Sequence, residues 1–262
     1  MKQPTMMGFR CALVLLLTCG ALPSSFATTI VIVRTRNLVV IASDSKAQYA
    51  GAQGLPQVCK IARQNETYFV VAGIAQDTGR GFLASRIVSN AIARSSSFDE
   101  QANAVESDML AALAKELGSM RTENPEEFKF AVTADSPSTI GLVTVEGGVP
   151  KVMVLSFIYD NASGNISVKR DSCPGTCGSE YSIIQMGHVL PPDDFAKATG
   201  SPTQVATKLV EMEIAREPQE VGPPIEVLEI RPDESQWVQD DLHCSVRVGT
   251  RAKYPRALTL DF

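Results

Sequence analysis

The sequence predicts an α+β fold in which antiparallel sheets and helices pack as layers around a buried core. Short β-branched apolar runs separated by polar turns come first, and two stretches with helical spacing follow them. Strand-like runs then return, and one more amphipathic helix precedes a closing strand. Because strands and helices come in blocks, a doubly wound parallel sheet is not expected. The 262 residues, 44% of them hydrophobic, can bury the core of one large domain.

The first 27 residues have the pattern of a cleaved secretory signal. Lys2 and Arg10 precede an apolar run over 11–22, which is too short to span a bilayer. Ser25 and Ala27 are the small residues that signal peptidase requires before its cut. We therefore expect cleavage after Ala27, a secreted or periplasmic location, and no membrane partner afterwards.

Composition limits the remaining chemistry. A formal net charge of -5 leaves no broad basic surface, so nucleic acid is not an expected partner. The two histidines, His188 and His243, are too few for a histidine-rich metal site, and we expect neither a metal nor a cofactor. Four cysteines follow the signal segment: Cys59, Cys173, Cys177 and Cys244. They allow three complete disulfide pairings, between which the sequence does not choose.

Two hairpins are expected near the start of the mature chain. The first joins strands over 28–34 and 38–42 through a three-residue tip at 35–37. That register places Thr28 opposite Asp44, with both side chains on one face. An aspartate that simply ends its strand is the alternative. The second hairpin joins 59–62 to 68–71.

The later elements follow from periodicity and capping signals. The sequence predicts helices over 80–94, from Ser97 onward and over 201–216, and strands over 128–133, 139–145, 152–159, 182–186 and 225–230. One domain over 28–231 therefore follows the signal segment 1–27, and a C-terminal extension over 232–262 has no assigned structure.

Signal cleavage would leave Thr28 as the first residue, with a hydroxyl and a free α-amine. An N-terminal threonine can act as a nucleophile because its own amine serves as the base. The reference pKa of an α-amine is about 8, so part of it is neutral near pH 7. An internal threonine lacks this base.

The segments TTIV (28–31), VVIASDSKA (39–47), KI (60–61) and AG (72–73) resemble the N-terminal half of proteasome β-type subunits. These proteins are N-terminal nucleophile (Ntn) hydrolases, and the bacterial peptidase of the two-component ATP-dependent protease is similar here. The acid lies sixteen residues after the threonine and the lysine thirty-two, as in that family. The resemblance covers about residues 28–75 by sequence and 76–230 only by the order of elements.

The resemblance implies a four-layer α-β-β-α sandwich and assigns four site residues. Thr28 would be the nucleophile, Lys60 would supply positive charge beside it, and Asp44 would orient that lysine. The backbone N–H of Gly73 would stabilise the oxyanion. A solvated strand lysine is the ordinary alternative for Lys60 taken alone.

The later half departs from the family pattern. A Gly-Ser-Gly loop usually supports the terminal amine, but residues 185–188 read Gln-Met-Gly-His. An aspartate and a serine usually follow the last long helix, where this chain has only Glu217 and Glu220. His188 and Glu220 are the candidate replacements.

The expected function is that of an exported threonine-type peptidase or amide hydrolase. Its expected substrates are peptides or unfolded chains, because an export compartment normally lacks the ATP that an unfolding partner needs. The resemblance also implies a homo-oligomer. The alternative is a catalytically inactive Ntn-fold scaffold or binding protein.

Overall fold

The computed structural model describes residues 28–47, 57–133, 136–178, 180–245 and 251–252. The expected signal segment, 1–27, lies outside these residues. Within them, no helix combines the length and the apolar character that crossing a membrane requires.

Strands make up most of the ordered secondary structure. They are β1 (Thr29–Thr35), β2 (Val39–Asp44), β3 (Ile61–Gln64), β4 (Thr67–Gly73), β5 (Gln76–Asp77), β6 (Phe82–Leu83), β7 (Ser138–Glu146), β8 (Val149–Asp160), β9 (Asn165–Cys173), β10 (Tyr181–Gly187), β11 (Ile225–Ile230), β12 (Ser235–Gln239) and β13 (Arg251–Ala252). The helices are α1 (Ala84–Ala93), α2 (Phe98–Glu123), α3 (Pro125–Thr133), α4 (Pro192–Phe195) and α5 (Pro202–Arg216).

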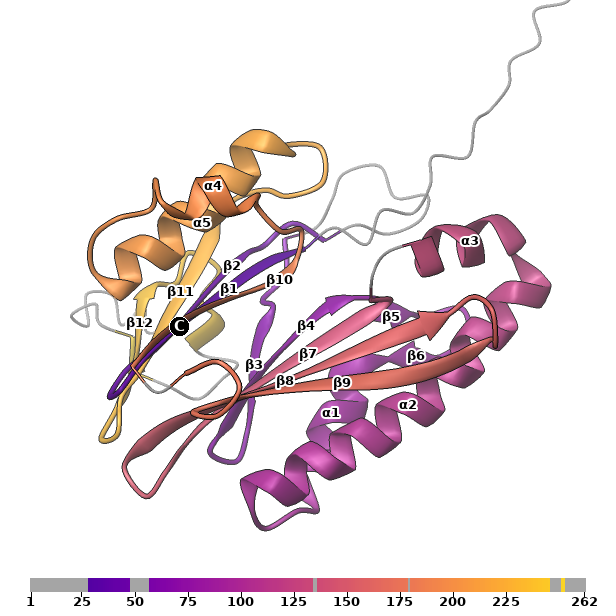
Figure 1. Ribbon diagram of the computed structural model, residues 1–262, viewed down its shortest axis with the longest axis horizontal. Coiled ribbons are helices and arrows are strands. Elements are labelled where there is room, and N and C mark those ends of the chain that lie inside the picture. The colour runs from indigo at the N-terminus through magenta and orange to yellow at the C-terminus, as the bar shows by residue number, and fades with distance from the viewer. Residues whose placement is uncertain (1–27, 48–56, 134–135, 179, 246–250, 253–262) are drawn as a thin grey trace, which may run out of the picture.

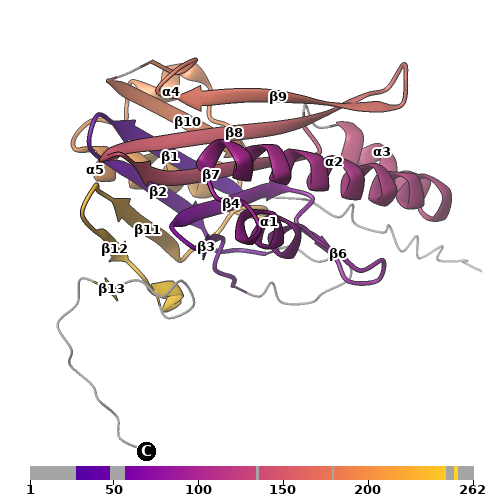
Figure 2. The same cartoon turned by 90° about the horizontal axis from the view of Figure 1, so that it is seen from below.

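The strands form three sheets. One has the order β10-β1-β2-β11-β12-β13, the second β3-β4-β7-β8-β9, and the third is the small pair β5-β6. All pairings are antiparallel except that of β12 with β13. Figures 1 and 2 show α5 beside the first large sheet and α1 and α2 along the second.

The expected four-layer α-β-β-α sandwich is wrong for this chain. The described residues form mostly antiparallel β-sheet in three sheets, with few helices. One full-length helix, α5, packs on the six-stranded sheet, where α4 has only four residues. The pattern of apolar runs missed two polar strands, β9 and β12, and so underestimated the share of β-structure.

Three clusters of buried side chains hold these elements together. Between the large sheets, Ile30, Ile32 and Ile41 from one sheet meet Val70 and Val154 from the other. The opposite faces of β1 and β2 contact α5, and those of β4, β7 and β8 contact α1 and α2. Because β1 and β2 are covered on both faces, their residues are apolar almost without alternation.

The first hairpin forms, but its register differs from the expected one by a residue. Ile30 pairs with Ser43 and Arg34 with Val39, so Thr29, and not Thr28, lies opposite Asp44. The backbone N–H of Thr35 donates to the carbonyl of Leu38, which shortens the tip to two residues. A tip length inferred from polarity alone was therefore too long.

The expected strand over 128–133 is also wrong, because these residues lie in α3. Pro125 occupies the first turn of this helix, and the Asn124 side chain accepts the backbone N–H of Glu127. Glu126 and Glu127 favour a helix start through their negative charge. The expected helix over 80–94 begins only at Ala84, and Arg80 instead forms ion pairs with carboxylates that include Glu116.

The segment that follows residue 231 contributes to the large sheet. Strand β12 pairs with β11, and Trp237 is fully buried. Disulfides join Cys59 to Cys244 and Cys173 to Cys177, which is one of the three pairings left open by the sequence. The first of these bonds ties the C-terminal segment to the residue before Lys60.

Candidate active site

The four residues expected at the site come from the ends of β1, β2 and β4 and from the residue before β3. Asp44 ends β2 and is fully buried. Its Oδ1 accepts the backbone N–H of Thr29 at 2.9 Å and the Lys60 ammonium at 2.5 Å. Its Oδ2 accepts the backbone N–H groups of Lys46 at 3.2 Å and Gly222 at 3.3 Å. Asp44 thus joins four chain segments through one carboxylate.

Lys60 lies inside the protein and not on its surface. Its side chain is 7% exposed, and its Nζ forms an ion pair with Asp44. Burial lowers the pKa of Lys60, while the charge and hydrogen bond of Asp44 act in the opposite direction. Lys60 is therefore not a solvated surface lysine. A buried amine with a lowered pKa can give up or accept a proton more readily near neutral pH.

Thr28 directly precedes β1, one residue from the hydrogen bond between Thr29 and Asp44. Its carbonyl accepts the backbone N–H of His188 at 2.8 Å. This bond continues the antiparallel pairing of β1 with β10 by one residue. Asp44 therefore contacts the peptide group between Thr28 and Thr29, and its side chain does not lie opposite that of Thr28.

Gly187 allows β10 to approach Thr28 closely. A Cβ at this position would lie 1.8 Å from the Thr28 carbonyl oxygen, and the glycine has φ of +81°. The same Cβ would lie 3.6 Å from the Ala72 Cβ, which places the end of β4 beside the start of β1. Only glycine fits this position.

Gly73 follows Ala72 and ends β4 with φ of +85°. A Cβ there would lie 2.3 Å from the Pro137 carbonyl oxygen, which accepts the N–H of Ile74. The backbone therefore turns sharply next to Thr28, at the position where the resemblance expects an oxyanion-binding N–H.

His188 and two acidic residues form a charged cluster behind Thr28. The His188 Nε2 lies 2.7 Å from a Glu220 carboxylate oxygen, and its Nδ1 lies 3.7 Å from Glu213. Glu213 is a buried residue of α5, and burial raises the pKa of its carboxyl, although the charges of Arg216 and His188 oppose this effect. The sequence analysis named His188 and Glu220 but missed Glu213. The helical spacing of the segment from Ser201 places Glu213 on the inner face of that helix, which could have identified it.

Several buried hydroxyl groups surround this strand end without a hydrogen-bond partner among the described residues: those of Thr29, Ser43, Ser45 and Ser138. Ser43 and Ser45 flank Asp44, and Ser138 pairs with Gly73. Buried hydroxyls normally bond to a partner or to ordered water. The site is thus polar in an otherwise apolar environment.

Comparison with known proteins does not identify this chain. No protein-family model matches it, and no curated protein matches it in sequence.

The residues expected at the site lie at neighbouring ends of strands. They comprise Thr28, the Asp44–Lys60 pair and Gly73 at the end of β4, and β4 contacts both β1 and β10. A hydroxyl, a buried amine and backbone N–H groups in such a place are suited to acyl transfer. The backbone N–H of Gly222, which also binds Asp44, is a site contact that sequence reasoning missed.

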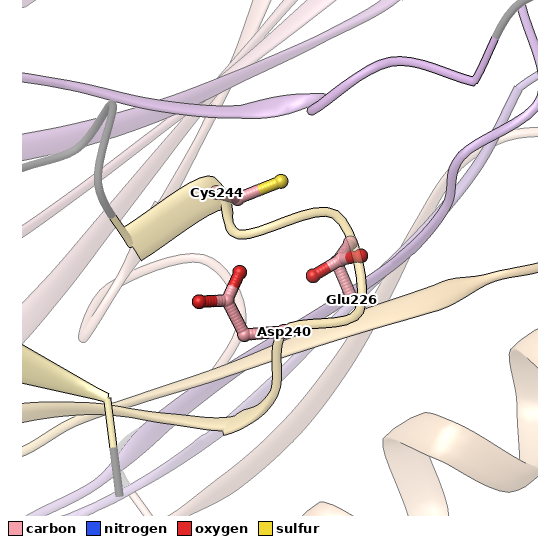
Figure 3. Close-up of side chains that lie close together, drawn as sticks. All are labelled: Glu226, Asp240 and Cys244. Carbon is pink, nitrogen blue, oxygen red and sulfur yellow. The ribbon is translucent and has the colours of Figure 1, made fainter. Parts of the chain in front are cut away.

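A second polar cluster lies between β11 and the C-terminal segment. The ligand atoms of Glu226, Asp240 and Cys244 all lie within 4.8 Å of one another, and Figure 3 shows these side chains together. Burial, followed by the negative charges of Asp240 and Asp241, raises the pKa of Glu226 to about 7. Nothing in the sequence spacing indicated this cluster.

Proposed function

We propose that this protein is an exported N-terminal threonine amidohydrolase that acts on peptides or unfolded chains. The observation that supports this proposal best is the hydrogen bonding of Asp44. The same Oδ1 accepts the Thr29 N–H and the buried Lys60 ammonium, so a positive charge lies beside the peptide that follows Thr28. A buried acid–lysine pair costs free energy, and such pairs are often found at functional sites.

Cleavage after Ala27 is the activating step in this proposal. Removal of the signal peptide leaves Thr28 with a free amine, while its carbonyl accepts the N–H of His188. The Thr28 hydroxyl attacks a substrate carbonyl carbon, and the amine takes the hydroxyl proton. That proton then passes to the leaving amine as the peptide bond breaks, and water hydrolyses the resulting ester to regenerate Thr28.

Lys60 and Gly73 have separate roles in this reaction. The Lys60 charge favours the alkoxide of Thr28 and lowers the proton affinity of the neighbouring amine. The N–H at Gly73 binds the oxyanion, a contribution worth about 3 kcal/mol in comparable sites. Asp44 keeps Lys60 in place through their 2.5 Å ion pair.

The test combines analysis of the terminus with kinetics. The exported protein is analysed by mass spectrometry for a chain that begins at Thr28, and then assayed with fluorogenic peptides and an unfolded protein. Thr28→Ala should lower kcat by about a thousandfold or more, because it removes the nucleophile. Thr28→Ser should retain part of the activity, since it keeps a hydroxyl and an amine.

Thr29→Ala is the matched control, because Thr29 binds Asp44 through its backbone and the substitution leaves that bond in place. It should keep most of the wild-type turnover. A mature chain that begins elsewhere, or a Thr28→Ala variant with unchanged turnover, would exclude the proposed mechanism.

A further inference from the structure

We propose that Glu226 and Asp240 share one proton, and that this carboxyl pair is a pH-sensitive latch that holds the turn over 240–245 closed. Loss of the proton opens the turn. The turn contains Cys244, and Figure 3 shows its side chain beside the two carboxyl groups. The latch is separate from the candidate active site and does not depend on the proposed hydrolase function.

The two carboxyl groups are buried and hydrogen-bonded to each other. Glu226 is fully buried and Asp240 is 8% exposed. A hydrogen bond joins the two side chains. An ionised carboxylate only accepts hydrogen bonds, so such a bond forms only when one of the two groups is protonated. The closed pair therefore holds one proton and one negative charge.

The surroundings of Glu226 do not compensate a second negative charge. Its Oε2 is buried and accepts no hydrogen bond from an N–H or hydroxyl group of the described residues. The charges that act most strongly on this side chain are those of Asp240 and Asp241, and both are negative. When two carboxyl groups share a buried place in this way, one of them stays neutral.

The neighbouring elements do not add a positive charge to the pair. On the β2 side, the residue opposite the glutamate is Ser43, which is uncharged. The Lys60 ammonium is bonded to Asp44. Within the turn, His243 is exposed to solvent, and the Cys244 sulfur is held in a disulfide and does not titrate. The shared proton is therefore what keeps the two carboxyl groups together.

The same carboxyl groups hold the backbone of the turn. Oε1 of Glu226 accepts the Leu242 N–H at 2.9 Å, and the two oxygens of Asp240 accept the Ser245 N–H at 3.2 and 3.3 Å. The Asp240 carbonyl accepts the His243 N–H at 3.1 Å. If the carboxyl groups move apart, these bonds break. Repulsion within the pair therefore acts directly on the turn.

The direction of the pH dependence follows from burial. Burial, followed by the negative charges of Asp240 and Asp241, raises the pKa of Glu226 from 4.5 to about 7 in the closed turn. The closed turn thus binds the proton more tightly than an open, solvated turn does. The stability that the proton provides is fully present below about pH 4.5 and is lost as pH rises through about 7. Over this interval the equilibrium constant for opening should increase by up to about tenfold per pH unit.

Opening of the turn would change the access of reductants to a disulfide. Cys244 is fully buried while the turn is closed, and it is bonded to Cys59. An open turn exposes this bond to thiols, whose attack depends on access to the sulfur atoms. The latch would therefore make the attachment of the C-terminal segment to the residue before Lys60 depend on pH.

The test measures amide hydrogen exchange over 240–245 by mass spectrometry, in the oxidised protein from pH 5 to 8. Glu226→Gln is the reference at each pH, because its amide donates to Asp240 as a protonated glutamate does and does not titrate. The ratio of the wild-type rate to the variant rate cancels the intrinsic pH dependence of exchange. We expect this ratio to rise by tenfold or more between pH 5 and pH 7 and then to level off.

Two further variants distinguish the pair from its neighbours. Asp241→Asn is the matched control, since Asp241 is exposed and adjacent but is not the hydrogen-bonded partner. It should keep the rise. Asp240→Asn removes the like charge and supplies a donor to ionised Glu226, so it should abolish the rise. It also serves as the reference if Glu226→Gln fails to fold.

Two results would overturn the latch. One is a ratio that stays constant from pH 5 to 8. The other is an equal rise for the amides of β1, which would mean that the whole domain unfolds and that the turn does not open by itself. Neither result depends on whether the protein has peptidase activity.

Discussion

Asp44 accepts four hydrogen bonds from four chain segments while it is fully buried. Asp44→Asn replaces an acceptor oxygen by a donor and leaves the Lys60 ammonium buried without its counter-charge. Such a change to a buried pair typically costs about 3–5 kcal/mol. We expect a fall of that size in the free energy of unfolding, measured by urea denaturation.

A double-mutant cycle with Lys60→Met tests this interpretation. The second substitution removes the stranded charge, so Asp44→Asn should cost less in the Lys60→Met background than in the wild type. Equal costs in both backgrounds would mean that the ion pair contributes nothing, and that Asp44 acts only through its backbone contacts.

Gly187 offers a test of how closely β10 must approach Thr28. Gly187→Ala would place a Cβ 1.8 Å from the Thr28 carbonyl oxygen, so β1 and β10 must separate. We expect a loss of about 3 kcal/mol or more in unfolding free energy, as for other strongly strained core positions. Peptidase activity should fall as well, because Thr28 moves.

Gly147→Ala is the matched control. Gly147 also has a positive φ, of +60°, but an added Cβ has nothing within 4 Å. It should cost only the backbone strain of about 1–2 kcal/mol and leave turnover unchanged. If both variants lost the same stability, the close contact with Thr28 would not be the cause.

For individual residues, the sequence predicted which residues interact better than it predicted the register of the strands that carry them. The resemblance to proteasome β-type subunits implied that Asp44 orients Lys60, and the two form an ion pair at 2.5 Å. The register placed Thr28 one residue away from its actual position, because hydrogen bonding at Thr35 and Leu38 shortens the turn. Side-chain patterns define the faces of a strand, but turn hydrogen bonds set its alignment.

Helix α5 carries Glu213 toward His188 at the end of β10. Burial raises the pKa of Glu213 above its usual value of 4.5, so the native protein binds this proton more tightly than the unfolded chain. The unfolding free energy should therefore be highest below about pH 4.5 as far as this group contributes, and should fall as pH rises through the native pKa.

Glu213→Gln should remove that contribution and flatten the pH dependence of stability, measured by urea denaturation from pH 4 to 8. Glu211→Gln is the control on the same helix, because Glu211 is exposed and pairs only with Lys208 among the described residues. A slope that Glu213→Gln does not change would assign the pH dependence to other groups.

Helix starts were predictable from the sequence where a side chain caps them. The capping boxes at Ser97 and Ser201 form as expected, with Glu100 and Gln204 completing them. Residues 128–133 were misread because three of the six are apolar or aromatic at strand-like spacing, whereas Pro125 and the Asn124 cap favour a helix. Strand β9 was missed because most of its residues are polar and partly or fully exposed, although turn residues precede it at 161–164.

The whole molecule is held by pairings between distant parts of the chain, which sequence reasoning predicts least well. Strand β11 joins β2, and Cys244 is bonded to Cys59 across a separation of 185 residues. The sequence supported an α+β arrangement of layers, but the chain forms mostly antiparallel sheet. Local patterns identify elements, while the share of each element and its long-range partner depend on tertiary contacts.

The two disulfides should differ in what they contribute to the stability of the whole molecule. A cross-link restricts the unfolded chain more when it closes a longer loop, and the chain-entropy relation gives about 5 kcal/mol for a separation of 185 and about 2 kcal/mol for one of 4. In the oxidised protein, Cys59→Ser/Cys244→Ser should therefore lower the unfolding free energy more than Cys173→Ser/Cys177→Ser. Urea denaturation of both double variants measures the difference. Equal losses would mean that local strain, and not loop closure, determines the effect, and the C-terminal segment would then be held mainly by the buried Trp237 and the pairing of β12 with β11.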